Sequence, residues 1–548
     1  MIMFTHKAIY LPLFLLAVTA AFAQERSRAV KIPKDAVSCN EYAPAMKQIF
    51  GQAVGVEQCS LISEETVFNI KGQKFRRLEL RLSGAVDGWA SREKGSRAIY
   101  FTDGPDFVLA QSGLTGPRSR GVGKYEAASG HGLTIFYPED ARDWNGKLYV
   151  TAHGAGSYGA IGALVPRDPD KKFNPLADLN RYVGLMIDKG YAVAHTMRSS
   201  DRTRGDITVT LEDGTKLSNY NLSSHAGLIT SWGQLARALI TKRLGTAPRK
   251  IYFYGHSAGG FLGRQINYQP GANQDSADKP FFDGFLIDDA GGGLWLPKLI
   301  TDNKDILFTT DEERRRFTKQ IDITHMLYAG DTGDYLQNKR ENARLLGEKG
   351  LSEKHRLYEI RGVSHFDAGQ VSRPDLVNQT LDLGGIFDAL IDRLDEWAEK
   401  NKAPTSSKMD VVKSTAKTGK NDEPSSAIAL PEVACPLGVY FAYPPEVDPG
   451  RRGGQETAFA VFDGTNLEPL DGRGNYVDMN GNGLRDKRES VDAAWQRLGL
   501  LKPGQKINSA AYQSCVKNAA AKLVTQGLLP AKVGSYYTEK SAATRLPN

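Results

Sequence analysis

The sequence predicts an α/β fold with a mostly parallel sheet and helices on both faces, plus an N-terminal strand-rich region and a small C-terminal module. Two observations predict the sheet. From about Leu133 onward, short apolar runs typical of strands alternate with longer helical patterns, which favours parallel pairing. One such run, Ile251–Phe253, leads into a glycine-rich turn and then into an expected helix that starts with Phe261–Ile266.

The N-terminus is typical of a secretory signal peptide, which we place at residues 1–23. Lys7 precedes an apolar core, residues 8–20, and the small-x-small sequence Ala21-Phe22-Ala23 ends just before Gln24. No later apolar run approaches the length of a membrane span, so we expect no membrane-spanning helix once the signal peptide is removed. The mature protein is therefore expected to be soluble and exported, either secreted or periplasmic.

The four cysteines agree with export. No C-x-x-C spacing occurs, which disfavours a metal site. In an oxidising compartment the simplest expectation is two disulfides, Cys39–Cys59 and Cys435–Cys515.

Composition and charge disfavour nucleic acid as a partner. The chain has 548 residues, of which 41% are hydrophobic and 24% charged, and its net charge is +7. These values are ordinary for a globular protein, and the positive charge is scattered along the chain, so nucleic acid is not an expected partner. The sequence predicts no organic cofactor, and it leaves the oligomeric state open.

The chain is expected to divide into four regions after the signal. Residues 24–125 are strand-rich, because Leu78, Leu80 and Leu82 alternate with charged residues. Residues 126–403 form the α/β domain. Residues 404–426 are a polar linker, and residues 427–548 are a C-terminal module that ends in helical segments. Within the α/β domain we expect strands at 147–152, 191–196, 284–287, 326–329 and 357–360, and helices at 228–240 and 386–397.

The turn Gly255-His256-Ser257-Ala258-Gly259 fits the G-x-S-x-G nucleophile elbow. Such a turn holds the serine in a strained backbone conformation, so Gly255 and Gly259 provide room that bulkier residues would fill. The helix N-terminus behind Ser257 favours negative charge on a ligand. A purely structural glycine turn is the alternative, and the position between strand and helix disfavours it.

A serine nucleophile needs a general base and an acid that orients the base. His365 is the predicted base, because it lies just past the last expected strand, at the edge where active sites of α/β folds gather. For the acid, Asp334 ranks ahead of Asp331, since it lies deeper in the same loop and precedes an aromatic residue. Asp288 and Asp289, at the end of an earlier strand, remain as further alternatives.

The oxyanion hole is expected to consist of backbone N–H groups. One is that of Ala258, the residue after the nucleophile. The other is expected from the glycine-rich stretch His153-Gly154-Ala155-Gly156, with Ala155 as first choice and Gly154 as second.

Taken together, these motifs resemble the α/β-hydrolase superfamily over about residues 126–403. The resemblance implies an exported Ser-His-Asp esterase, lipase or related acyl hydrolase that cleaves a carboxylic ester through an acyl-enzyme intermediate. A serine peptidase or an acyltransferase on the same fold is the first alternative. The second is a non-catalytic, hydrolase-like scaffold whose calcium module is the working part.

Residues 478–489 fit the twelve-position calcium loop D-x-[DN]-x-[DN]-G-x5-E. Gly483 supplies the sharp turn at the sixth position, and a helix that begins near Val491 is the expected exit helix. Because the entry side is not helical, the site resembles an EF-hand-like loop without its first helix, and a structural Ca²⁺ is expected. An Asn-Gly turn without metal is the alternative. The expected ligands are Asp478, Asn480, Asn482, the Leu484 carbonyl, Asp486 and Glu489.

Overall fold

The computed structural model describes residues 32, 34–49, 52–92, 99–102, 119–125, 131–153, 181–197, 207–218, 226–268, 271–275, 279–290, 300–301, 304–305, 310–327, 335–370, 377–409, 426–442, 455–462 and 490–547. Several predicted features lie outside the described residues. They are the signal peptide at residues 1–23, the glycine-rich stretch from Gly154, the acid candidates Asp331 and Asp334, and the calcium loop at 478–489.

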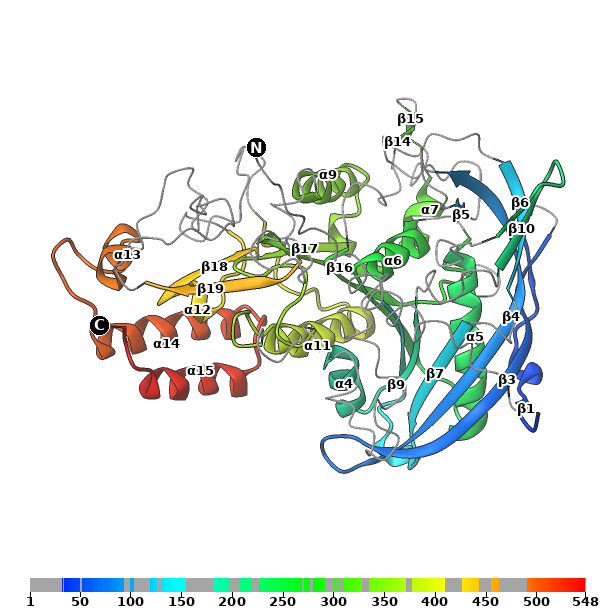
Figure 1. Ribbon diagram of the computed structural model, residues 1–548, viewed down its shortest axis with the longest axis horizontal. Helices are drawn as coiled ribbons and strands as arrows, with labels where there is room; N and C mark the ends of the chain where they lie inside the picture. The colour runs from blue at the N-terminus through cyan, green and yellow to red at the C-terminus, as the bar shows by residue number, and fades with distance from the viewer. Residues whose placement is uncertain are drawn as a thin grey trace, which may run out of the picture.

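One large sheet organises the described residues (Figure 1). Its path runs in the order β11-β10-β6-β4-β7-β9-β8-β12-β13-β16-β17. From β9 to β17 each strand pairs parallel with its neighbour, whereas β7 pairs antiparallel with β9. The predicted α/β fold with a mostly parallel sheet is therefore confirmed. The strands are β4 (Lys74–Arg92), β6 (Ser119–Tyr125), β7 (His131–Pro138), β8 (Lys147–His153), β9 (Ala192–Met197), β10 (Ile207–Leu211), β11 (Lys216–Ser218), β12 (Lys250–His256), β13 (Gly284–Asp288), β16 (Lys319–His325) and β17 (His355–Ile360).

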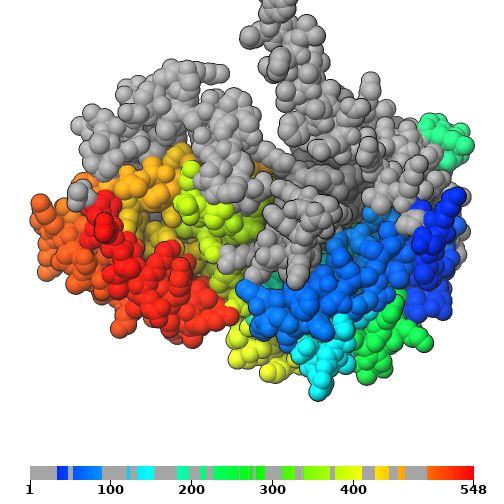
Figure 2. Space-filling model, turned by 60° about the horizontal axis from the view of Figure 1, so that its bottom comes forward, coloured from blue at the N-terminus to red at the C-terminus, as the bar shows by residue number. Residues whose placement is uncertain are grey.

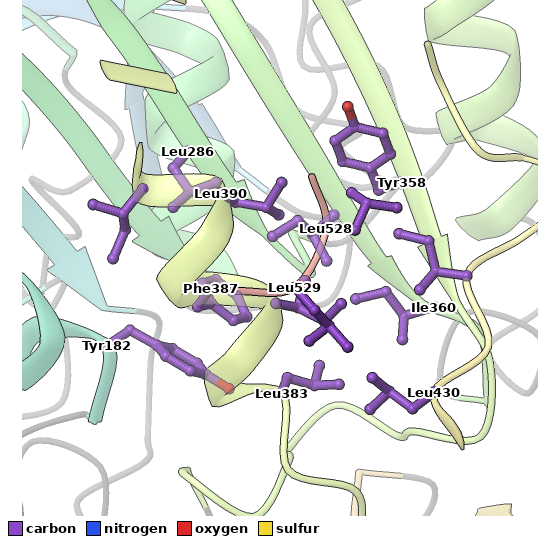
Figure 3. Close-up of a cluster of buried hydrophobic side chains, with 14 of the residues drawn as sticks. Tyr182, Leu286, Tyr358, Ile360, Leu383, Phe387, Leu390, Leu430, Leu528 and Leu529 are labelled. Atoms are coloured by element: carbon purple, nitrogen blue, oxygen red, sulfur yellow. The ribbon is translucent and has the colours of Figure 1, made fainter. Parts of the chain in front are cut away.

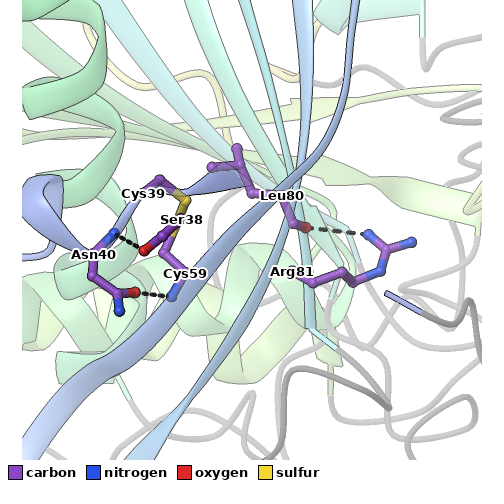
Figure 4. Close-up of a disulfide and its surroundings, with 6 residues drawn as sticks. All are labelled: Ser38, Cys39, Asn40, Cys59, Leu80 and Arg81. Carbon is purple, nitrogen blue, oxygen red and sulfur yellow. Dashed lines mark hydrogen bonds between the residues drawn. A yellow bond between two sulfur atoms is a disulfide. The ribbon is translucent and has the colours of Figure 1, made fainter. Parts of the chain in front are cut away.

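The N-terminal region is rich in strands, as predicted, and it extends the same sheet. Strand β4 pairs antiparallel with β3 (Gln52–Phe68) and β5 (Ile99–Thr102), and also with β6 and β7. The predicted disulfide Cys39–Cys59 is present, with a Cα–Cα distance of 5.0 Å. Figure 4 shows how Asn40 reinforces it, since its Oδ1 accepts a hydrogen bond from the N–H of Cys59.

Helices cover both faces of the parallel strands, and the alternation of side chains along β12 explains why. Phe253 lies in the hydrophobic cluster on the face of α5 and α6, whereas its neighbours Tyr252 and Tyr254 lie in the cluster on the face of α4 and α11. Because successive side chains of a strand point to opposite faces, a strand covered on both sides is apolar throughout. The helices are α4 (Arg181–Asp188), α5 (Ala226–Leu244), α6 (Ala258–Tyr268) and α11 (Gly384–Lys400).

The C-terminal residues pack on the α11 face of the sheet. Figure 3 shows Leu430, Leu528 and Leu529 in one cluster with Ile360 of β17 and Phe387 of α11. The space-filling view shows the C-terminal helices on the left and the N-terminal strands on the right of the visible face (Figure 2). The elements here are α12 (Pro431–Ala434), β18 (Gly438–Ala442), β19 (Thr457–Val461), α13 (Val491–Arg497), α14 (Ser509–Thr525) and α15 (Ala531–Ala543). The second predicted disulfide, Cys435–Cys515, joins the end of α12 to α14.

The strand expected at residues 326–329 was wrong in position. The strand is β16, Lys319–His325, and Met326 already lies in a helical turn. The cause is a set of buried polar side chains, since Gln320, Asp322 and Thr324 alternate with isoleucines on β16. Asp322 accepts hydrogen bonds from Arg264 and Gln320, and these bonds offset the free-energy cost of burying its carboxylate.

The predicted linker, residues 404–426, begins as an extension of the sheet edge. The N–H of Lys408 donates to the Leu357 carbonyl, and the Lys408 carbonyl accepts from the N–H of Glu359. Ile428 makes the same kind of bridge to Glu359 and Arg361. Both segments therefore continue the hydrogen-bonding pattern of β17.

Candidate active site

Polar residues gather where neighbouring parallel strands end. His256 is the last residue of β12, Asp288 the last of β13 and His325 the last of β16. His256 and Asp288 are register partners, and Asp288 pairs in turn with Ile323. The loop after β17 adds His365. Since open α/β sheets bind their ligands at the carboxyl edge, this cluster is the candidate active site.

Ser257 occupies the tight bend between β12 and α6 that the sequence predicts. Its φ is 57°, the left-handed region that a non-glycine residue rarely adopts. Its N–H donates to the Asp288 carbonyl at 2.9 Å, and its own carbonyl accepts from the N–H of Phe261 at 3.1 Å. A Cβ on Gly255 would lie 2.4 Å from the backbone of Gly259, so the bend requires glycine there.

Helix α6 begins at Ala258, directly after the bend. The first N–H groups of a helix have no partner within it, and the helix dipole places partial positive charge at the same end. The N–H of Ala258, the predicted oxyanion donor, is one of these first N–H groups of α6. The other predicted donors, Gly154 and Ala155, lie outside the described residues.

His365 contacts a carboxylate and packs against the ring of His256. Its Nδ1 is 2.6 Å from Oδ2 of Asp289. Its ring centroid is 4.6 Å from that of His256, the residue that precedes Ser257. Because an ionised carboxylate only accepts hydrogen bonds, Nδ1 carries the proton, and Nε2 keeps the lone pair that a general base needs.

Asp289 is fixed on several sides. Its Oδ1 accepts from Nζ of Lys339 at 3.1 Å and from the N–H of His325 at 3.0 Å. Burial alone would raise the pKa of Asp289, but the charges of Lys339 and His325 and the hydrogen bond from His365 hold it well below its usual value. Asp289 is therefore an ionised acceptor for His365.

Asp289 is one of the lower-ranked acid candidates from the sequence. The two that ranked higher, Asp334 and Asp331, lie outside the described residues. The sequence does carry a signal for Asp289: two consecutive aspartates directly follow the apolar run 285–287, at the end of β13. Which of the two faces the histidine depends on the backbone turn, and Asp289 has a φ of 37°.

The other aspartate, Asp288, binds a second set of polar groups. It accepts from Nδ1 of His256 at 2.9 Å, from the Tyr254 hydroxyl at 3.1 Å and from Nε2 of Gln370 at 3.0 Å. Nε2 of His325 lies 3.2 Å from its Oδ1. The two aspartates thus connect three histidines in one buried cluster.

His325 is a site residue that the sequence analysis missed, because the strand was expected to start after it. Its Nδ1 donates to the carbonyl of Ser364 at 2.7 Å, next to His365. Burial disfavours its charged form, but Asp289 and Asp288 outweigh burial and raise the pKa of His325 to about 9. A charged His325 therefore links the aspartate pair to the backbone of the His365 loop.

Burial has the opposite net effect on His365. Burial and the neighbouring charge of His256 together outweigh the attraction of Asp289, and they lower the pKa of His365 to about 4. The imidazole is consequently neutral at neutral pH, the state in which it can accept a proton.

We expect the pH dependence of hydrolysis to report this low pKa. As the predicted general base, His365 acts deprotonated, so kcat/KM should stay constant down to about pH 5 and fall as the pH drops through about 4, below the ordinary histidine value of 6.5. The unfolded chain binds this proton more tightly, so the free energy of unfolding should also decrease as the pH falls from 6.5 towards 4. Measuring activity and melting temperature on the same samples separates titration from unfolding. A midpoint near 6.5 with the fold intact would contradict the expectation.

Neither a metal site nor a membrane-spanning helix is found among the described residues. No group of three or more His, Cys, Asp or Glu side chains among them is arranged to hold a metal ion. Among the described helices, none has the length and apolar character needed to cross a membrane.

Comparisons with known proteins identify one family. A family model described as "Alpha/beta hydrolase domain" matches residues 226–537. A search of curated proteins found no match.

Several solved structures are similar to this chain at low scores. One is the rice cell wall degrading esterase LipA from Xanthomonas oryzae, at 10% identity over 62% of this chain and 99% of that chain, with a TM-score of 0.32. A second is a glucuronoyl esterase from Solibacter usitatus, at 14% identity over 65% and 78%, with a TM-score of 0.27. A third is a truncated carbohydrate esterase from gut microbiota, at 13% identity over 48% and 90%, with a TM-score of 0.28.

Proposed function

This chain belongs to the family of alpha/beta hydrolase domains, and on that premise we propose that it is a serine hydrolase that cleaves carboxylic esters. The observation that carries the proposal is the contact between His365 and Asp289, with the His365 ring against that of His256, the residue before the strained bend at Ser257. A serine hydroxyl needs an oriented, neutral imidazole to become a nucleophile, and the Asp289 contact and the low pKa of His365 support these two features.

The proposed reaction has two steps, formation of an acyl-enzyme and its hydrolysis, and His365 transfers the proton in each. Ser257 Oγ attacks the ester carbonyl carbon while its proton passes to Nε2 of His365. The imidazolium, stabilised by Asp289, then protonates the departing alkoxide as the carbon–oxygen bond of the ester breaks. The N–H of Ala258 stabilises the oxyanion of the tetrahedral intermediate. Water, activated by the same imidazole, releases the acid and restores Ser257.

A panel of nitrophenyl and aromatic esters of graded acyl length tests this function. Hydrolysis of at least one ester supports the proposal, and the preferred length defines the acyl specificity. A peptidase would instead cleave amides, and an acyltransferase would transfer the acyl group to an added alcohol. A folded protein that turns over no acyl substrate would favour the non-catalytic scaffold.

We also propose that the protein is secreted or periplasmic. The signal-like sequence at residues 1–23 supports this, as do the two disulfides, because such bonds persist in oxidising compartments.

The loop at residues 478–489 is proposed to bind a structural Ca²⁺ through the six ligands that its sequence predicts. The helix expected after it is present as α13, which starts at Val491 with Ser490 as its N-cap. Trp495 of α13 is buried, and its Nε1 donates to the Pro436 carbonyl at 2.8 Å. Calcium at this loop would therefore stabilise the connection between β19 and the C-terminal helices.

Removing calcium is expected to lower the melting temperature. A ligand present at 100 times its Kd stabilises the folded state by about 2.7 kcal/mol, so the effect should be measurable by calorimetry. Glu489→Gln should abolish the response to calcium, and Glu539→Gln, an exposed residue of α15, should leave it intact. A purified protein that contains no calcium and melts identically in chelator would refute this site.

A further inference from the structure

The loop that carries His365 needs hydrogen-bonding partners from outside the parallel sheet. Strand β17 ends at Ile360, so the peptide groups around His365 have left its hydrogen-bonding ladder. Ser364 and His365 are buried, and an unpaired N–H in such a place costs free energy comparable to a lost hydrogen bond. The partners of the two flanking N–H groups therefore decide how firmly His365 is held.

Both N–H groups donate to residues far along the chain, at the start of β19 and two positions before it. The N–H of Ser364 donates to Oγ1 of Thr457 at 3.0 Å, across 93 residues. The N–H of Phe366 donates to the carbonyl of Gln455, also at 3.0 Å. Thr457 is itself buried, with 1% of its surface exposed, so water does not substitute readily for its hydroxyl.

The hairpin that carries Thr457 is anchored to the rest of the core. Strands β18 and β19 pair antiparallel, and Phe462 closes the pair by donating to the Leu437 carbonyl at 3.0 Å. Just before β18, the Cys435–Cys515 disulfide ties the chain to α14. Helix α12 also packs tightly against the chain that leads from β17 to His365, since a Cβ on Gly362 would lie 2.7 Å from Cγ2 of Val433.

The opposite side of the His365 loop is held by His325, which donates to the Ser364 carbonyl. The peptide groups around Ser364 are therefore fixed from two directions, by β16 on one side and by β19 on the other. Only the β16 contact belongs to the parallel sheet.

We propose that Thr457 is a positioning residue for His365, and that the β18–β19 hairpin is a structural part of the catalytic site. This inference rests on the proposed function, because it assigns to Thr457 the task of holding the general base. Its hydroxyl binds the N–H of Ser364, the residue before His365, and the Gln455 carbonyl binds the N–H of Phe366, the residue after it. Displacement of the imidazole by a fraction of an ångström would weaken proton transfer from Ser257.

Replacing Thr457 by valine tests the proposal, since valine keeps the shape and removes the acceptor. Thr457→Val should lower kcat about 10- to 100-fold with little change in KM, because misplaced catalytic groups lose rate rather than binding. Thr457→Ser, which restores the hydroxyl, should recover most of the activity. If the valine variant does not fold, Thr457→Cys, whose thiol is a weak acceptor, serves instead and should show a smaller loss of kcat.

The matched control is Ser407→Ala. The Ser407 Oγ accepts from the N–H of Leu357 on β17 at 3.0 Å, so this change removes the same type of bond away from His365. It should lower the melting temperature without lowering kcat. The proposal is overturned if Thr457→Val keeps the wild-type kcat, or if Thr457→Ser fails to recover it. A wild type without any hydrolase activity overturns the proposed function itself, which the ester panel shows separately.

Discussion

Ser257→Ala is expected to abolish ester hydrolysis, with kcat lower by at least about 10⁴-fold. The strained bend places Ser257 at the N-terminus of α6, directly after His256, whose ring contacts that of His365. Alanine removes the only group proposed to bond to the acyl carbon, so the covalent route closes. The residual rate would come from the oxyanion donors and from binding alone.

The measurement is steady-state hydrolysis of the best ester of the panel, with circular dichroism to verify the fold. Ser407→Ala is the control for a serine-to-alanine change, and it should retain wild-type kcat. If Ser257→Ala hydrolyses the ester at an undiminished rate, Ser257 is not the nucleophile.

Asp289→Asn is expected to have the second largest effect, a loss in kcat of about 10³- to 10⁴-fold. Asparagine can donate to Nδ1 of His365, which would favour the tautomer with its proton on Nε2. That tautomer cannot accept the serine proton. The substitution also leaves Lys339 without its buried carboxylate partner, so a lower melting temperature should accompany the loss of activity.

The comparison with Asp331→Asn and Asp334→Asn identifies the acid. We expect both variants to retain hydrolysis close to the wild-type rate, because the contact at Nδ1 of His365 is made by Asp289. If Asp334→Asn loses activity while Asp289→Asn stays active, the acid lies on the later loop, and the sequence-based ranking of Asp334 ahead of the others would stand.

Much of the parallel sheet was predictable from local patterns. Apolar runs marked β8, β9, β12, β13 and β17, and the glycine spacing around Ser257 marked the bend. Strand β16 was misplaced because its polar residues satisfy one another only in three dimensions: Asp322, for example, binds Arg264 of α6 and His355 of β17. Polar side chains on such a strand weaken the period-2 pattern on which the sequence prediction depends.

The contacts around His365 were not predictable for a similar reason. Asp289 and Thr457 lie 76 residues before and 93 residues after their partners in the His365 loop, and nothing in the local sequence joins them. Composition suggested a linker at residues 404–426 and a separate module after it. Yet Lys408 and Ile428 bridge to β17, and Trp495 and Tyr512 lie in the same hydrophobic cluster as α11.

The most direct test of the central claim is to map the residue that a fluorophosphonate probe modifies. Trypsin should release residues 251–264 as one peptide, in which Ser257 is the only serine. We predict that mass spectrometry of the labelled wild type finds the adduct on Ser257, and that Ser257→Ala remains unlabelled. An adduct on a different residue, or a folded wild type that does not react, would contradict the assignment of Ser257 as nucleophile.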